Sequence, residues 1–235
     1  MKAFLLAAGY GTRLRPLTET VPKCLVPVRG RPLLGWWLDL LRGHGVSGVL
    51  INTHYLPEQV DAYVDGYCQE YPELAVETVF EPELLGSGGT VSRNRGFVGK
   101  DEDFLICYGD VLTDLNLTDM ARFHQTHSGV LTMALYHAPH PSQCGIVQMD
   151  AEGRIQTFQE KPDKPASDLA NAGVYLARRS LLDRLPDTVP LDFGGDVLPK
   201  LTGNIYGYLP DCYLLDIGSM ERYQRAQEEW PHDYL

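Results

Sequence analysis

Short apolar runs alternate with helical patterns through the first half of the chain, and this rhythm limits the fold more than any other feature. Runs that indicate buried strands cover residues 3–8, 49–53, 76–80 and 104–108. Helical periodicity covers residues 33–44, 57–68 and 89–96. Strands that alternate with helices in this way predict an α/β fold, with a mostly parallel sheet that has helices on both faces.

The pattern changes after Gly129. Alternating residues at 146–149 and 155–160 flank the turn Asp150-Ala151-Glu152-Gly153, which predicts a small antiparallel insertion. The last expected elements are a strand at 213–215 and an amphipathic helix at 220–230, for which Ser219 is a suitable N-cap. No repeat, low-complexity segment or linker interrupts the chain, so we expect one continuous domain.

Charge narrows the range of possible partners. The chain has 31 acidic and 20 basic residues, which gives a formal net charge of −11. A field of this sign repels polyanions, so we expect no nucleic acid and no anionic membrane surface as a partner. A small phosphorylated ligand fits such a chain only if the few cations are concentrated in one place.

The cysteines and the apolar runs indicate the cellular compartment of the protein. The five cysteines are odd in number and contain no Cys-x-x-Cys pair, so neither a disulfide framework nor a zinc site is predicted. A reducing, cytoplasmic location fits best. The apolar run at the start is too short for a signal peptide, and no run approaches the ~18 residues of a membrane span.

A glycine-rich loop with built-in cations follows the first expected strand. The loop reads Gly9-Tyr10-Gly11-Thr12-Arg13-Leu14-Arg15-Pro16, and Lys23 comes shortly after it. Backbone N–H groups in such a loop can point at phosphate oxygens. The dinucleotide fingerprint fails because Leu14 replaces its third glycine and because no acid ends the second strand, and the Walker sequence is absent. We interpret the loop as a phosphate-binding loop in preference to a solvated turn.

These residues and several later motifs carry a resemblance to a known family. The loop continues through Leu17-Thr18 and is followed by Pro22-Lys23-Cys24-Leu25-Val26-Pro27. The later motifs are Leu85-Gly86-Ser87-Gly88-Gly89, Gly109-Asp110, Glu160-Lys161-Pro162, Asn171-Ala172-Gly173 and Asp216-Ile217-Gly218. In all of them the chain resembles the sugar-1-phosphate nucleotidyltransferases, which join a nucleoside triphosphate to a sugar 1-phosphate and release pyrophosphate.

The resemblance implies a Rossmann-like, GT-A-like nucleotidyltransferase fold in one domain over residues 1–235. It assigns residues 1–128 mainly to the nucleotide, 129–218 mainly to the sugar phosphate and 219–235 to a C-terminal helix. It also implies catalytic roles for Arg13, Lys23 and Asp110. The remaining nucleotide contacts that it implies are Leu6, Ala8, Gly9, Gly11, Thr12, Gly86 and Ser87, and the chemistry of the base adds Glu81.

The resemblance further implies a metal and a sugar pocket. Asp110 and Asp216 each end an apolar strand, and two carboxylates at strand ends suit Mg²⁺, although either residue could also be a turn former. For the sugar phosphate the implied residues are Gly145, Glu160, Lys161, Asn171 and Gly173. A surface ion pair in a hairpin is the alternative interpretation of Glu160 and Lys161.

The substrates follow partly from resemblance and partly from chemistry. Residues 192–199 look like those of the short mannose or heptose guanylyltransferases, and Glu81 or Glu83 could accept both N1–H and the exocyclic amine of guanine. We therefore expect GTP with mannose 1-phosphate or D-glycero-D-manno-heptose 1-phosphate. The alternatives are dTTP or UTP with glucose 1-phosphate, a catalytically silent nucleotide-sugar regulator, and a glycosyltransferase, which usually carries an Asp-x-Asp motif absent after Gly109. The oligomeric state stays open between monomer and homodimer.

Overall fold

The structure is a computed structural model in which residues 1–231 are described. The chain forms two compact units. The first unit combines Met1–Leu84, Tyr108–Leu115 and the segment from Cys212 onward. The second unit combines Leu85–Cys107 with Asn116–Asp211. The division into parts at residue 128 stays a prediction, and residues 232–235 of the expected C-terminal helix lie outside the described residues.

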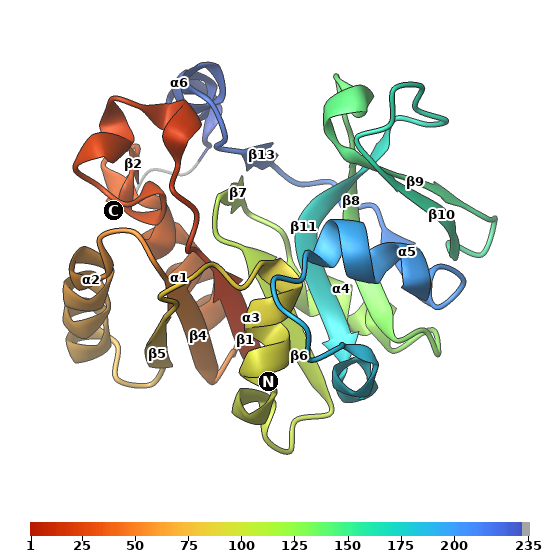
Figure 1. Cartoon of the computed structure of the whole chain (residues 1–235), viewed down its shortest axis with the longest axis horizontal. Helices are drawn as coiled ribbons and strands as arrows, with labels where there is room; N and C mark the ends of the chain where they lie inside the picture. Colours follow the sequence, from red (N-terminus) through yellow and green to blue (C-terminus); the bar gives the residue numbers. More distant parts are fainter. Residues whose placement is uncertain (232–235) are drawn as a thin grey trace. The chain divides into compact units, whose positions relative to one another are not determined.

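The first unit is built on a parallel sheet of three strands, coloured red to brown in Figure 1. Its central strand carries six consecutive buried residues, as a strand covered on both faces must. The strands and the two helices between them are β1 (Lys2–Leu6), α1 (Leu33–Gly43), β4 (Gly48–Thr53), α2 (Pro57–Glu70) and β5 (Ala75–Phe80). Helix α1 buries leucines and Trp37 on one face, and the Trp37 indole donates to the Val111 carbonyl at 2.6 Å.

Two ribbons and a helix complete the first unit. The antiparallel ribbons pair β2 (Pro27–Val28) with β3 (Arg31–Pro32) and β7 (Val111–Thr113) with β13 (Leu214–Asp216). Helix α6 (Met220–Glu229) starts at the expected N-cap, because the Ser219 hydroxyl accepts from the Arg222 N–H at 3.3 Å. The ribbon of β7 and β13 therefore joins two segments of the chain that lie about a hundred residues apart.

The second unit is mainly antiparallel. Its longest strand, β11 (Leu169–Arg178), pairs with three others, which are β6 (Asp103–Tyr108), β8 (Leu131–His137) and β9 (Gly145–Met149). Strand β9 also pairs with β10 (Ile155–Glu160), and β8 pairs in parallel with β12 (Ile205–Tyr208). The helices of this unit are α3 (Ser87–Arg93), α4 (Leu117–His124) and α5 (Leu198–Leu201) (Figure 1).

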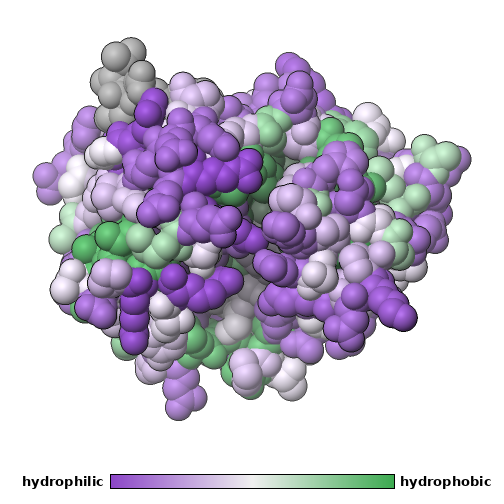
Figure 2. Space-filling model, turned by 90° about the horizontal axis from the view of Figure 1, so that it is seen from above, coloured by the Kyte–Doolittle hydropathy of each residue, from purple (hydrophilic) through white to green (hydrophobic). Residues whose placement is uncertain are grey.

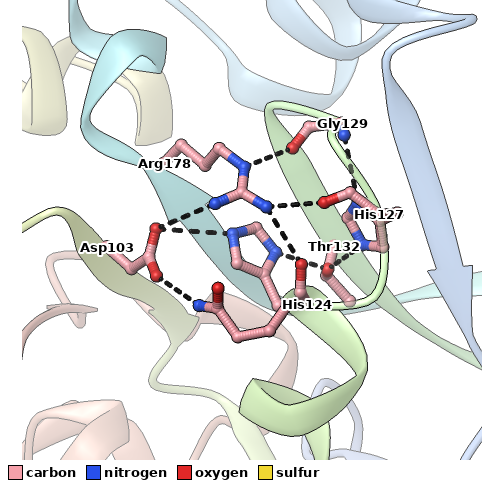
Figure 3. Close-up of polar contacts among 7 residues, drawn as sticks. Asp103, His124, His127, Gly129, Thr132 and Arg178 are labelled. Carbon is pink, nitrogen blue, oxygen red and sulfur yellow. Dashed lines mark hydrogen bonds and ion pairs between the residues drawn. The ribbon is translucent and has the colours of Figure 1, made fainter.

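A buried polar network connects α4 to β8 and β11 in this unit (Figure 3). The Gly129 N–H donates to His127 Nδ1 at 3.1 Å, so the neutral ring donates from Nε2 to the Thr132 hydroxyl at 2.8 Å. Thr132 then donates to His124 Nδ1 at 2.6 Å, and His124 Nε2 faces the Asp103 carboxylate at 3.5 Å. Arg178 closes the network by donating to three carbonyls. With both rings neutral, each histidine has one nitrogen that donates and one that accepts, and the His124 Nε2–H faces Asp103 Oδ1 without forming a hydrogen bond.

The α/β class predicted from the sequence is confirmed. The strands expected at 49–53, 76–80 and 104–108 each gain one residue at the start, and the strand at 155–160 has the expected bounds. All five cysteines are free thiols. Over residues 1–231 no helix is long and apolar enough to cross a membrane. Hydrophilic residues predominate on the face shown in Figure 2, with hydrophobic residues in small patches.

Candidate active site

The glycine loop is fixed in a conformation that requires glycine at one position. Gly11 has φ 64°, and a Cβ there would lie 3.0 Å from the Lys23 Cβ. The Gly11 carbonyl accepts from the Leu14 N–H at 2.9 Å and from the Thr18 hydroxyl at 2.7 Å. These bonds hold the short helical turn Thr12–Leu14, which carries Arg13, and they place Lys23 directly against the loop.

The two aspartates expected to act together are neighbours in the first unit. Asp216 is the last residue of β13 and is paired in register with Val111, the residue after Asp110. The Ile217 N–H also donates to the Asp110 carbonyl at 2.8 Å. The ribbon of β7 and β13 thus brings together two carboxylates that the sequence alone left far apart.

Three cations surround these carboxylates. Lys23 Nζ lies 2.7 Å from Asp110 Oδ2, and Arg222 Nη1 lies 2.5 Å from Asp216 Oδ2. Arg13 is close as well, since a Cβ built on Gly218 would lie 2.8 Å from Asp216 Oδ1 and 3.1 Å from Arg13 Nη2. Arg13 and Lys23 from the loop region, together with Arg222, are therefore concentrated here.

Arg222 is a residue that sequence reasoning missed. It lies in the first turn of α6, a mostly polar helix whose sequence carries no motif. The N-cap at Ser219 is the one signal that could have found it, because it fixes the start of α6 just after Asp216 and Gly218.

The pKa of Asp216 is shifted in opposite directions by its surroundings. Its pKa is raised, first by desolvation and then by the negative charge of Asp110, while Lys23, Arg222 and Arg13 lower it. Asp216 Oδ1 is buried and has no hydrogen-bond partner among residues 1–231. A buried carboxylate oxygen without a partner is costly, so this atom is suited to a cation that enters with the ligand.

The donor set of this site fits Mg²⁺. No group of three or more His, Cys, Asp or Glu side chains that could hold a metal occurs among the described residues. Mg²⁺ does not require such a cage, because it binds through one or two carboxylates and completes its shell with phosphate oxygens and water. Asp110 and Asp216 supply those carboxylates, and Asp216 Oδ1 is available to such an ion.

Glu81 lies at the carboxyl ends of the parallel strands, and Glu83 does not share its setting. Glu81 is 2% exposed and follows β5, whereas Glu83 is exposed. Its Oε1 accepts from Asn52 Nδ2 at 3.0 Å, and Asn52 Oδ1 accepts from the Ala7 N–H at 2.7 Å. Nearby, the Leu6 carbonyl accepts from the Gly109 N–H at 2.8 Å, and Ala8 is buried. Glu81 is therefore the one of the two glutamates that lies beside the start of the glycine loop.

In the second unit, three of the residues expected to bind the sugar phosphate gather at the ends of β9 and β10. Gly145 is in register with Glu160, and a Cβ at Gly145 would lie 2.9 Å from Glu160 Oε2. Lys161 has φ 46°, and its N–H donates to the Cys144 carbonyl at 3.0 Å. Lys161 Nζ lies 3.4 Å from Glu160 Oε1, and both side chains are exposed. Because Gly145 and Gly194 have no side chains, both can approach the Glu160 carboxylate closely.

Asn171 and Gly173 lie at an irregularity in β11. The pairing of β11 with β8 shifts register between Asn171 and Tyr175, and Gly173 has φ 73°. Asn171 Oδ1 accepts from the Gly173 N–H at 3.0 Å, and Asn171 Nδ2 donates to the buried Tyr175 hydroxyl at 2.6 Å. The irregularity fixes the direction of the Asn171 amide, which no sequence pattern indicated.

The loop before α3 is held by a second loop of the same unit. The Gly88 and Gly89 N–H groups both donate to the Leu191 carbonyl, at 2.9 and 3.1 Å. Gly86 has φ 78°, and a Cβ there would lie 2.5 Å from the same oxygen. The Ser87 hydroxyl donates to the Asp192 carboxylate at 3.1 Å. The loop expected to hold the base is therefore held by several hydrogen bonds, and Asp192 is a contact that sequence reasoning did not foresee.

Fold and site together define an α/β protein with a cluster of cations and carboxylates suited to phosphate groups and a divalent metal. Comparison with known proteins gives the family. The model of the family described as nucleotidyl transferase matches residues 2–232. The chain belongs to this nucleotidyl transferase family and, as the motifs predicted, to its sugar-1-phosphate nucleotidyltransferases.

Curated relatives of different substrate classes are similar to this chain. A UTP–glucose-1-phosphate uridylyltransferase of Synechocystis is 33% identical over 96% of this chain and 62% of its own length. A mannose-1-phosphate guanylyltransferase of Mycobacterium tuberculosis is 32% identical over 97% of this chain and 64% of its own length. The chain thus spans less than two thirds of the length of these relatives.

Solved structures share the fold. HddC from Yersinia pseudotuberculosis has a TM-score of 0.79 at 24% identity, covering 97% of this chain and 99% of its own. A putative glucose-1-phosphate thymidylyltransferase from Bacillus anthracis has a TM-score of 0.85 at 21% identity, covering 97% and 94%.

Proposed function

We propose that the protein transfers a nucleoside monophosphate from a nucleoside triphosphate to a sugar 1-phosphate, giving a nucleoside diphosphate sugar and pyrophosphate. An oxygen of the sugar phosphate attacks the α-phosphorus, and the bond from that phosphorus to pyrophosphate breaks. Both reactants are anions, so catalysis depends on positioning and on neutralising charge. The observation that carries the proposal is the cluster of Arg13, Lys23 and Arg222 around Asp110 and Asp216.

The cations have distinct roles in this proposal. Arg13 grips the triphosphate and stabilises the charge that develops on the departing pyrophosphate, which suits a guanidinium that can bind phosphate with two N–H groups. Lys23 neutralises the reacting phosphates as a point charge. Its ion pair with Asp110 holds the ammonium in place before substrate binds. Arg222 orients Asp216 through its contact with Oδ2.

Asp110 and Asp216 would hold the Mg²⁺ ion. When bound, the ion supplies positive charge to the phosphate oxygens and helps to orient them. The carboxylates themselves keep the positive charges of Lys23 and Arg222 close to the phosphates without full neutralisation of the site.

The second unit supplies the groups for the sugar phosphate in this proposal. Glu160 accepts hydrogen bonds from sugar hydroxyls beside Gly145, and Lys161 binds the phosphate. Asn171, held by the bend at Gly173, adds a donor and an acceptor of fixed direction. The Gly86–Ser87 loop, which is held by hydrogen bonds to the Leu191 carbonyl and to Asp192, contacts the base.

Glu81 is proposed to select guanine. A carboxylate can accept both the N1–H and the exocyclic amine of guanine, whereas uracil and thymine offer only one imide donor. The wrong base then leaves a buried acceptor half satisfied, which costs on the order of 1–3 kcal/mol. With GTP we propose a manno-configured 1-phosphate, either mannose 1-phosphate or D-glycero-D-manno-heptose 1-phosphate, and the guanylyltransferase among the relatives supports this choice.

A uridylyltransferase or thymidylyltransferase acting on glucose 1-phosphate is the second candidate, favoured by the similarity to the Synechocystis enzyme. The deciding measurement is kcat/KM for GTP, dTTP, UTP, CTP and ATP with mannose, heptose and glucose 1-phosphates in the presence of Mg²⁺. We expect GTP with a manno-configured sugar to lead by at least about tenfold. A preference for UTP or dTTP with glucose 1-phosphate would replace this assignment, and binding without turnover would indicate a silent regulator.

A further inference from the structure

Four hydrogen bonds in the first unit join the glycine loop to Glu81 in a closed circuit. The Ala7 N–H donates to Asn52 Oδ1 at 2.7 Å, and Asn52 Nδ2 donates to Glu81 Oε1 at 3.0 Å. On the other side, His54 Nδ1 lies 2.7 Å from the Glu81 carbonyl oxygen, and His54 Nε2 lies 2.6 Å from the Tyr10 hydroxyl. The backbone from residue 7 to residue 10 closes the circuit.

The carbonyl of Glu81 fixes the direction of these bonds. A carbonyl oxygen only accepts, so His54 Nδ1 carries the proton and donates to it. In the neutral ring Nε2 is then the acceptor, and the Tyr10 hydroxyl donates to it. Asn52 is fixed in the same way, because the Ala7 N–H needs the amide oxygen and therefore turns the amide nitrogen towards Glu81. Each member of the circuit thus has one orientation.

Tyr10 is an exposed residue of the glycine loop, next to the turn that is held at the Gly11 carbonyl. It lies between Gly9 and Gly11, and a Cβ at Gly9 would meet nothing within 4 Å. The Tyr10 ring is 49% exposed and meets the His54 ring edge-on, with centroids 4.9 Å apart. An exposed tyrosine contributes little to a core, so its short bond to His54 acts mainly on the conformation of the loop.

We propose that Tyr10, His54 and Asn52 are positioning residues that tie Glu81 to the phosphate-binding loop, His54 through the Glu81 carbonyl and Asn52 through its carboxylate. Recognition of the base by Glu81 then helps to set the conformation of the loop that carries Arg13, so the correct base raises kcat as well as lowering KM. This inference rests on the proposed function, in which Glu81 contacts the base and the loop contacts the triphosphate.

The test compares GTP with ITP, which lacks the exocyclic amine, in the wild type, Tyr10→Phe, Glu81→Gln and the double variant. Tyr10→Phe keeps the ring and removes only the hydroxyl. We expect it to lower kcat/KM for GTP by about tenfold, mostly in kcat, and to lower the GTP/ITP ratio at least threefold. In the Glu81→Gln background the same change is expected to cost less than about twofold. Asn52→Ser is expected to lower the ratio as Tyr10→Phe does.

A matched control is Tyr55→Phe. The Tyr55 hydroxyl also donates one hydrogen bond, to the Glu19 carbonyl at 2.8 Å, and its ring lies 6.2 Å from that of Tyr10, but Tyr55 is outside the circuit. We expect the GTP/ITP ratio of this variant to equal that of the wild type. Melting temperatures of all variants identify any loss of folding.

The inference would be overturned by losses that multiply in the double variant, or by a Tyr10→Phe enzyme with an unchanged GTP/ITP ratio. Failure of the proposed function looks different, because the wild type itself would then prefer another triphosphate or fail to turn over. If another triphosphate is preferred, the same cycle is measured with it. The result of that cycle then decides whether Tyr10 is coupled to Glu81.

Discussion

The two units hold their proposed functional residues in different ways. In the first unit, Lys23 pairs with Asp110 and Arg222 pairs with Asp216, each at 2.7 Å or less, and the two aspartates are neighbours. In the second unit, Glu160 and Lys161 are exposed and 3.4 Å apart, and their positions come from strand register and a positive φ. The difference suggests a division of labour, with preorganised charge for the chemical step in the first unit and open side chains for binding in the second.

The largest effect is expected from removing a carboxylate of the first unit. Asp110→Asn and Asp216→Asn should each lower kcat by on the order of a thousandfold, since an amide is a poor ligand for a hard dication and contributes no charge. The dependence of the rate on Mg²⁺ concentration should weaken in both. Binding of Mn²⁺ to each variant, followed by electron paramagnetic resonance, checks the metal site without relying on activity.

The control for this pair is Asp211→Asn, which removes an exposed carboxylate of the second unit. The double variant Asp110→Asn/Asp216→Asn should be no worse than the more damaged single variant, because both residues serve one site. A normal Mg²⁺ titration in either single variant would remove that residue from the metal site.

Arg13→Ala is expected to have the next largest effect. Its proposed contact strengthens as charge moves onto pyrophosphate, so kcat should fall about a hundredfold, equivalent to about 3 kcal/mol, with KM for the triphosphate changed much less. Arg15→Ala removes the same charge from the same loop and should cost much less. An Arg13→Ala enzyme with wild-type kcat and only a raised KM would show that the first unit binds the triphosphate without preorganising the chemistry.

Much of the fold could be predicted from the sequence, but less of the site. Buried strands and amphipathic helices leave local patterns, so the bounds of β4, β5, β6 and β10 were found to within one residue. The meeting of Asp110 with Asp216 depends on the ribbon of β7 and β13, whose three-residue strands carry no pattern of their own. Arg222 was missed because an arginine in a polar helix resembles any solvated residue, and only the N-cap at Ser219 marks where that helix begins.

The hydrogen-bonded circuit around Glu81 could not be predicted from the sequence either. Asn52 and His54 stand where a dinucleotide fold would carry an acid, and the sequence therefore excluded one function without indicating another. Their roles depend on which strands are neighbours, since β1, β4 and β5 lie side by side only in the folded sheet. Choosing Glu81 over Glu83 likewise required the burial that the structure provides.

Glu160→Gln tests the proposed binding role of the second unit. Loss of the charge weakens the bonds that Glu160 is proposed to accept from sugar hydroxyls, so KM for the sugar 1-phosphate should rise about tenfold while kcat changes by less than about threefold. Glu152→Gln alters an exposed carboxylate of the same unit and should leave both constants unchanged. Steady-state kinetics with a saturating triphosphate gives both numbers, and a fall confined to kcat would contradict the proposed division of labour.

The smallest effect concerns the stability of the second unit. Burial lowers the pKa of His124 to about 4; the charge of Asp103 opposes this shift, and the charge of Arg178 adds to it. Burial, with the charges of His124 and Arg178, also lowers the pKa of His127 to about 4. Below about pH 6.5 the unfolded chain binds protons that the folded network does not, so stability should fall from pH 6.5 to pH 4 by about 1 kcal/mol or more.

Urea unfolding at a series of pH values measures the slope of the free energy of unfolding against pH. His124→Asn should flatten it, whereas His137→Gln, which changes an exposed histidine on β8, should leave it as in the wild type. A slope that survives the loss of His124 would show that other groups account for the acid sensitivity.

The most direct test of the central claim is the initial rate of pyrophosphate release from GTP and mannose 1-phosphate with Mg²⁺, in the wild type and in Asp216→Asn. We expect release to require both substrates, one nucleoside diphosphate sugar to form for each pyrophosphate, and the variant to be slower by on the order of a thousandfold. Pyrophosphate release that proceeds without any sugar 1-phosphate, or at the wild-type rate in Asp216→Asn, would contradict the central claim.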